Sequence, residues 1–217
     1  MSVALEKPTT QAVTDAGKRF DEENRIIEDA LGELFRQFPK NTNPAHVLLK
    51  VLALSDLYST QIPLYSKRIP TVREVVDHIV ELEIDPALES GSSDLVYNIA
   101  KTKAPNKEVH SNYSFATKYC NWHRSEFYPI YDSRVDEYLW HLQNQGYIDR
   151  FVRQDLKKYR RLKEIITKFR DSFLPEKFTY KEIDKFLYHN GGKLFVEKQK
   201  EKQSAITAKS QPSQPVA

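Results

Sequence analysis

Apolar residues recur at three- and four-residue steps along most of the chain, which is the spacing of one face of an α-helix. In the segment 18–37 and directly after it, this face consists of Phe20, Ile27, Leu31, Leu34 and Phe38. Similar segments follow to about position 195, and strand-like alternation is nearly absent. The pattern predicts an all-α protein with eight or nine helices and no clear β-hairpin.

Capping residues indicate where the first of these helices begin. Asn43 directly before Pro44 is typical of an N-cap followed by proline in the first helical turn. The segment 45–60 is apolar nearly all round, so we expect a buried central helix. Thr71 stands in the cap position before the next helix, over residues 72–84.

Later helices carry the same signals. Asp132 occupies the N-cap position before a helix over residues 133–145, which Gly146 should end. Thr179 and Glu182 have the spacing of a capping box at the start of the last helix. We expect that helix to end at Gly191–Gly192.

Three stretches between these caps complete the predicted organisation. Asp85–Pro86 should stop the helix that begins after Thr71, and residues 102–112 read as a polar loop. Residues 153–173 predict one long, basic amphipathic helix.

The 217 residues suit one domain, which we place at residues 16–195. Residues 1–15 are polar and lack periodicity, so we expect a disordered tail there. Residues 196–217 are rich in Lys, Gln, Ser and Pro, a composition that also predicts disorder.

Composition excludes several classes of protein. The chain has one cysteine, which rules out a disulfide framework, a zinc finger and a four-cysteine iron–sulfur cluster. Its six glycines form neither GxGxxG nor GxxxxGK, so a phosphate-binding loop of the nucleotide-fold type is absent. There is no apolar run of about 18 residues and no secretory signal. We therefore expect a soluble cytoplasmic protein without cofactor, metal or membrane contact.

Charge is distributed unevenly along the chain. Residues 1–149 have 22 Asp and Glu against 16 Lys and Arg, whereas residues 150–202 have 16 Lys and Arg against 8 Asp and Glu. The densest basic run comprises Lys157, Lys158, Arg160, Arg161 and Lys163. Such a run is either a solvated helix face or a surface that contacts the phosphates of a nucleic acid.

Aromatic residues concentrate in the segment 112–132, where most should be core and some should line a cleft. Cys120 and His123 have the spacing of a metal-ligand pair or of a nucleophile and its base. Two ligands do not make a metal site, and no partner residue for a nucleophile is evident, so we favour neither.

Asp132 allows a structural and a chemical interpretation at once. As an N-cap it accepts hydrogen bonds from helix N–H groups, and these with the helix dipole favour its ionised form. An ionised carboxylate at a cleft can stabilise a developing positive charge, such as an oxocarbenium ion at a sugar C1′.

The helix S-F-A-T-K-Y, a short turn and then P-I-Y-D-S-R-V together resemble small bacterial proteins related to the helix-hairpin-helix (8-oxoguanine glycosylase-like) DNA glycosylases. Residues 128–135 resemble the V-P-V-D-T-H-V-like segment of that superfamily, whose aspartate caps a helix and is catalytic. The segment LLKVLALSDLYSTQI resembles its long helix that ends in a pocket-lining or DNA-probing turn. Two features differ: the G-V-G hairpin is missing, and the candidate Schiff-base lysine, Lys118, lies only 14 residues before Asp132.

The resemblance implies two helical lobes with a cleft between them, a middle lobe of residues 43–130 and a second lobe of residues 16–42 and 131–195. It implies a monofunctional DNA glycosylase that flips a damaged or modified base and hydrolyses its N-glycosidic bond, in repair or in phage defence. Asp132 would be catalytic, with Lys118 as a further candidate. DNA would be the partner of a monomeric protein.

The glycosylase hypothesis and the charge pattern together give the remaining site residues. The base pocket would contain Tyr58, Tyr119, Trp122, His123 and Tyr131. DNA would contact Asn112, Ser114, Arg134, Lys157, Lys158, Arg160, Arg161 and Lys163. The alternative is a non-catalytic helical protein that binds nucleic acid or a protein partner, with Asp132 only a cap. An abortive-infection or toxin-type helical protein is a third interpretation.

Overall fold

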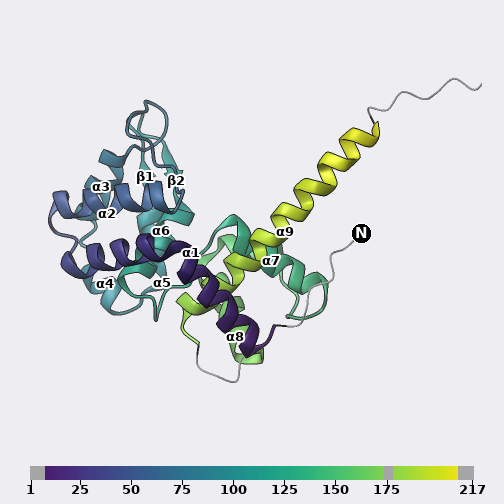
Figure 1. Ribbon diagram of the computed structural model, residues 1–217. Helices are drawn as coiled ribbons and strands as arrows, with labels where there is room; N and C mark the ends of the chain where they lie inside the picture. Colours follow the sequence, from purple (N-terminus) through teal and green to yellow (C-terminus); the bar gives the residue numbers. More distant parts are fainter. Residues whose placement is uncertain (1–7, 174–177, 210–217) are drawn as a thin grey trace, which may run out of the picture.

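The computed structural model describes residues 8–173 and 178–209. Over these residues it has nine α-helices, one 3-10 helix and a single pair of short strands, which confirms the all-α class. Figure 1 shows two groups of helices, with α2–α6 and the strands on one side, α7–α9 on the other, and α1 running along both.

The first half of the chain contains eight elements. They are α1 (Thr10–Gln37), α2 (Pro44–Leu57), α3 (Val72–Glu81), α4 (Asp85–Glu89), α5 (Ser93–Ala100), β1 (Lys101–Lys103), β2 (Val109–Ser111) and α6 (Tyr113–His123). The second group comprises α7 (Ser133–Asn144), η1 (Arg153–Lys157), α8 (Tyr159–Phe173) and α9 (Tyr180–Lys209). The helix α9 packs along both α7 and α1, so the C-terminal helix joins the two ends of the fold.

The predicted caps are confirmed. Asn43 Oδ1 accepts a hydrogen bond from the N–H of Ala45 at 2.9 Å. Thr71 forms a capping box with Glu74 at the start of α3. Thr179 and Glu182 form the expected box at the start of α9.

Two predictions for the first half were wrong. The segment 102–112, expected to be a loop, contributes to an antiparallel hairpin in which Thr102 pairs with His110. Strands of three residues are too short to show alternation. Asp85–Pro86 does not simply stop a helix but begins α4, since proline is tolerated in a first helical turn.

The first helix starts earlier than its apolar face predicted. It begins at Thr10, in a segment expected to be a tail, and Thr9 Oγ1 accepts from the N–H of Ala12 at 3.2 Å. Val13 and Ala16 from this added turn are buried in the core. Residues 1–7 of the expected tail lie outside the described residues.

The prediction that the last helix ends at Gly191–Gly192 was wrong. The helix continues to Lys209. Gly191 lies against the backbone at the start of α7, where an added Cβ would stand 2.2 Å from the carbonyl oxygen of Arg134. The glycine therefore permits a close approach of two helices rather than ending one. Residues 210–217 lie outside the described residues.

The predicted basic helix over 153–173 is two helices, η1 and α8. They are separated at Lys158, whose backbone is extended with φ −106° and ψ 106°. The break lets Leu156 and Tyr159, on either side of it, both point into the core with no exposed surface.

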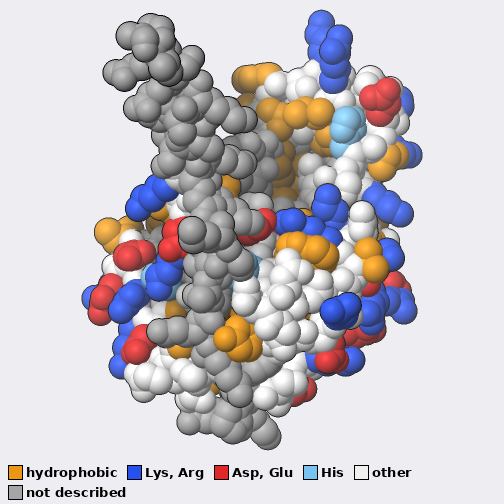
Figure 2. Space-filling model, turned by 90° about the vertical axis from the view of Figure 1, so that its right-hand side faces the viewer, with side chains coloured by type: hydrophobic (Ala, Val, Ile, Leu, Met, Phe, Trp, Pro, Cys, Tyr) orange, Lys and Arg blue, Asp and Glu red, His pale blue; other side chains and the backbone are white. Residues whose placement is uncertain are grey.

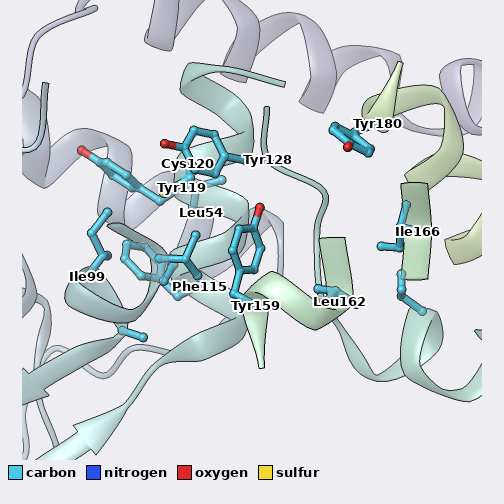
Figure 3. Close-up of a cluster of buried hydrophobic side chains, with 14 of the residues drawn as sticks. Leu54, Ile99, Phe115, Tyr119, Cys120, Tyr128, Tyr159, Leu162, Ile166 and Tyr180 are labelled. Atoms are coloured by element: carbon cyan, nitrogen blue, oxygen red, sulfur yellow. The ribbon is translucent and has the colours of Figure 1, made fainter. Parts of the chain in front are cut away.

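One continuous apolar core joins both groups of helices. Figure 3 shows part of it, where Phe115 and Tyr119 of α6 lie beside Leu54 of α2, and Tyr159 and Leu162 of α8 lie nearby. The aromatic segment before α7 supplies Tyr128, whose hydroxyl donates to the carbonyl of Ala87 at 3.0 Å.

The sequence predicted that the central helix is buried on all sides, but α2 has an exposed face. Leu48 and Leu49 are exposed, and Lys50 is fully buried. The ammonium of Lys50 donates to the carbonyls of Phe38 at 3.0 Å and Lys40 at 3.1 Å, just beyond the end of α1. It also donates to Asn41 Oδ1 at 2.6 Å. A buried lysine thus fastens the turn between α1 and α2.

Candidate functional site

A pocket of about 480 Å³ is formed by residues of α1, the end of α2, α6, the start of α7 and α9. This volume lies in the range of small-molecule sites in proteins. The lining contains three carboxylates and two cations: Glu28, Lys118, Asp132, Arg134 and Asp184. Ionisable groups gathered in a cleft are candidates for a functional site.

Asp132 is the N-cap of α7, as predicted. Its Oδ1 accepts hydrogen bonds from the N–H groups of Arg134 and Val135, both at 2.9 Å. Its Oδ2 lies 3.9 Å from the ammonium of Lys118. The cap holds one oxygen in place, and the second oxygen faces a cation in the pocket.

Lys118 comes from the middle of α6 and is almost fully buried. Its ammonium donates to the carbonyl of Tyr58 at 3.3 Å and lies 5.8 Å from the centre of that ring. Burial lowers the pKa of Lys118, and the negative charge of Asp132 opposes that shift. The two residues predicted to be catalytic are therefore brought together.

Asp184 on α9 was missed by sequence reasoning. It lines the pocket, and its Oδ1 is inaccessible to solvent and makes no hydrogen bond. Burial raises the pKa of Asp184 to about 8, with the charge of Asp132 adding to the shift. The only signal in the sequence is a carboxylate between the apolar residues Ile183 and Leu187, at the edge of the buried face of the helix.

Glu28 on α1 was also missed. It accepts a hydrogen bond from the hydroxyl of Tyr58 at 2.5 Å and pairs with Lys181 at 2.8 Å. Both partners come from other helices, so nothing local in the sequence indicates the site.

Four other predicted residues line this pocket. They are Tyr58, Ser114, Tyr131 and Arg134. The hydroxyl of Tyr131 donates to Asp136 Oδ2 at 3.1 Å, and the guanidinium of Arg134 lies 4.2 Å from the centre of the Tyr188 ring. Tyr131 and Tyr188 are thus held by contacts with Asp136 and Arg134.

Three aromatic residues that we assigned to a base pocket lie outside its lining. Tyr119 is fully buried, and its hydroxyl donates to Asn41 at 2.6 Å. His123 also contacts Asn41, and burial lowers its pKa to about 3. The Trp122 ring lies edge-on to the Tyr58 ring, with ring centres 5.9 Å apart, but Trp122 does not line the pocket. Tyr119 faces the core, whereas Trp122 and His123 at the end of α6 are partly exposed and line a separate pocket beside α1 and α4.

Residues 10–127 match the model of the HI_0787_N family, described as an N-terminal domain. The chain belongs to the HI_0787_N family. The HI_0787_N match contains Glu28, Tyr58 and Lys118, whereas Asp132 and Asp184 lie beyond it.

The chain is also similar to one curated protein. It is 36% identical over 132 residues to a protein of Haemophilus influenzae described as uncharacterized. The similarity covers 60% of this chain and 62% of the relative, so the chain spans less than two thirds of that protein's length. No solved structure matches.

The basic residues around α8 lie away from the pocket of this HI_0787_N protein, because none of them lines it. Arg160 pairs with Asp94 at 2.6 Å, and Lys158 pairs with Asp155 at 3.0 Å. Arg161 pairs with Glu164. On the face in Figure 2, Lys and Arg side chains likewise lie next to Asp and Glu.

The other predicted DNA contacts have separate surroundings. Lys163 is half-buried with its ammonium 6.0 Å from the centre of the Tyr128 ring, and Lys157 is exposed on η1. Asn112 precedes α6 without capping it through its side chain, and its buried Nδ2 has no hydrogen-bond partner.

Cys120 and His123 do not form the pairs that their spacing allowed. Cys120 is fully buried, and burial raises the pKa of its thiol, which opposes a nucleophilic role. In the described part of the chain, no three His, Cys, Asp or Glu side chains gather as metal ligands would. Nor does any described helix combine the length and apolar composition needed to span a membrane.

Proposed function

We propose that this protein is a DNA glycosylase that hydrolyses the N-glycosidic bond of a flipped, damaged or modified base. The observation that carries the proposal is Asp132, a helix N-cap whose second oxygen faces a pocket beside Lys118. Two backbone N–H groups orient this carboxylate before any substrate binds. Preorganised charge of this kind is usually the largest contribution to transition-state stabilisation.

In the proposed reaction the extruded nucleotide enters the pocket between α1, α6 and α9. Tyr58 and Tyr131 supply aromatic walls, and stacking on aromatic side chains is worth ~1–3 kcal/mol per base. As the bond to the base breaks, positive charge grows at C1′, and the carboxylate of Asp132 stabilises it. Water then adds to C1′, which leaves an abasic site.

We also propose that this protein is related to the helix-hairpin-helix DNA glycosylases. This relationship is supported by a lysine on one helix that lies close to an aspartate capping the next, after a short turn. The short hairpin β1–β2 directly precedes α6, where that superfamily has its glycine-rich hairpin.

DNA would lie across the mouth of the pocket. Ser114 and Arg134 line it and would contact phosphates there, and the turn after α2 contains Ser59 and Gln61 with positive φ angles of 51° and 55°. We infer that this turn approaches the gap left by the flipped base. The basic residues around α8 would add phosphate contacts further along the duplex.

A second activity, cleavage of the DNA strand through a Schiff base, is favoured by the position of Lys118. Its lowered pKa increases the fraction of neutral amine, the form that attacks C1′. Monofunctional hydrolysis is the primary proposal because the cap of Asp132 suits activation of water.

Product analysis tests the proposal and separates these activities. The protein is incubated with DNA duplexes carrying 8-oxoguanine, uracil, 5-hydroxymethylcytosine or 7-methylguanine. Monofunctional hydrolysis gives free base and strands that break only after alkali. Lyase activity gives breaks without alkali and a borohydride-trapped adduct that Lys118→Met abolishes. Binding of DNA without release of any base would favour a non-catalytic binding protein.

A further inference from the structure

The three carboxylates of the pocket are held in different ways. Asp132 accepts two backbone hydrogen bonds, and Glu28 accepts from Tyr58 and pairs with Lys181. Asp184 Oδ1 has no hydrogen bond although it is shielded from solvent. An unpartnered buried carboxylate oxygen is costly unless the group is protonated or meets a ligand.

The surroundings of Asp184 favour the protonated form. Its charged and titratable neighbours come from five parts of the fold: Glu28 of α1, Tyr58 after α2, Lys118 of α6, Asp132 at the start of α7, and Lys181 and Tyr188 of α9. Burial is the largest influence and the negative charge of Asp132 is next, and together they raise the pKa of Asp184 to about 8. The two lysines oppose the shift without cancelling it.

The two aspartates of the pocket therefore differ in their surroundings. Asp132 Oδ1 accepts hydrogen bonds from two backbone N–H groups, whereas nothing donates to Asp184 Oδ1. Pairs of carboxyl groups whose environments differ in this way divide the roles of acid and base in hydrolysis.

We propose that Asp184 is protonated in the empty pocket and donates its proton to the departing base, while Asp132 remains ionised. This inference rests on the proposed glycosylase function. The bond from C1′ to the base nitrogen breaks, and its electron pair goes to the base. The base takes the proton of Asp184 at a ring nitrogen or carbonyl oxygen. Water bonds to C1′ and loses a proton to Asp132, and exchange with solvent restores both groups.

A proton donor is useful for only one class of base. A neutral base leaves poorly as an anion, so protonation assists its departure. A cationic base such as 7-methylguanine leaves as a neutral molecule and needs no donated proton. The inference therefore assigns the site to neutral bases that have an acceptor atom within reach of Asp184.

Infrared spectroscopy tests the protonation state without any substrate. Wild-type protein at pH 7 should show the carbonyl band of a protonated carboxyl group, and the band should titrate near pH 8. Asp184→Asn should remove it. Asp171→Asn is the matched control, because Asp171 is exposed on α8 and does not line the pocket. Absence of the band in wild-type protein would overturn the inference.

The rate of base release tests whether Asp184 donates a proton to the departing base. Asparagine keeps the shape of the side chain but cannot give up a proton in this way. Asp184→Asn should slow release of a neutral base, such as 8-oxoguanine or uracil, by ~100-fold or more. Release of 7-methylguanine should stay within a few-fold of wild type.

The outcomes distinguish the two proposals. If the wild-type protein releases bases and Asp184→Asn releases neutral ones equally fast, the proton transfer is wrong and the glycosylase proposal stands. If wild type releases only 7-methylguanine, proton donation is again wrong. If wild type releases no base, the glycosylase proposal fails and the proton transfer fails with it, while the infrared band still reports the state of Asp184.

Discussion

The ammonium of Lys118 lies 3.9 Å from Oδ2 of Asp132, and 7% and 13% of the two side chains are exposed. Their meeting depends on how α6 and the turn before α7 are placed. The helix α7 is held in turn by α9. The contact between α7 and α9 is the most extensive between any two of the described elements. Variants that separate α7 from α9 should therefore disturb this ion pair.

Gly191→Ala should destabilise the fold. The added methyl group would stand 2.2 Å from the backbone oxygen of Arg134, and backbone cannot move aside as a flexible side chain can. Overpacking of this kind costs ~1–3 kcal/mol or more. The measurement is the free energy of unfolding in urea.

Gly17→Ala is the matched control for this change. Gly17 also lies within a helix, but no atom comes within 4 Å of its would-be Cβ. The variant should be more stable than wild type by ~0.5–1 kcal/mol, because glycine weakens a helix interior. Equal stability of the two variants would contradict the packing of α9 on α7.

Lys50→Met should lower stability at pH 7. It removes the donor to two backbone carbonyls after α1 and to Asn41, and leaving buried acceptors unpaired costs ~1–3 kcal/mol each. Burial lowers the pKa of Lys50 from 10.5 to about 8 in the folded state, so the unfolded chain binds more protons between these values. Wild-type stability should therefore rise relative to Lys50→Met from pH 8 to pH 10. A difference that shrinks over this range would contradict the buried lysine.

Asp184→Asn should change how stability depends on pH, whatever the reaction. A folded-state pKa near 8, above the ordinary 3.8, means that the folded protein binds more protons between these values. The contribution of Asp184 is present below pH 4 and is lost as pH rises to 8. Stability of wild type should fall relative to Asp184→Asn between pH 5 and pH 8, as thermal melting would show. Parallel curves would indicate an ordinary carboxylate.

Replacing Arg160, Arg161 and Lys163 by alanine should weaken binding to all DNA sequences alike. If each contacts a phosphate, the log–log salt dependence should flatten by up to ~3 units. Arg160 and Arg161 already form ion pairs with Asp94 and Glu164, so binding a phosphate would replace a carboxylate partner. This exchange favours a smaller change in the salt dependence. An unchanged slope in a filter-binding or anisotropy titration would remove α8 from the interface.

Local signals in the sequence predicted the starts of four helices, α2, α3, α7 and α9. The caps at Asn43, Thr71, Asp132 and Thr179 are each satisfied within three residues, so their chemistry is visible in the sequence. The hairpin β1–β2 was missed because its pairing joins two segments that have no strand pattern of their own.

Features that depend on distant contacts were not predictable. Lys50 can be buried because backbone carbonyls after α1 accept its hydrogen bonds. Gly191 is needed because its backbone lies against Arg134 of α7, more than fifty residues earlier. Asp184 joins the pocket only when α9 folds back onto α1 and α7. The cap at Asp132 was predictable because its hydrogen-bond partners are only two and three residues away.

The most direct measurement of the central claim is base release by Asp132→Asn. Asparagine caps a helix about as well as aspartate, so folding should be preserved, with thermal melting as the control. Loss of the negative charge should leave DNA binding intact or tighter. Release of free base should fall by several orders of magnitude, in line with the ~3–4 kcal/mol or more that a preorganised group contributes to a transition state. A folded Asp132→Asn protein that releases base at the wild-type rate would contradict the catalytic role of Asp132.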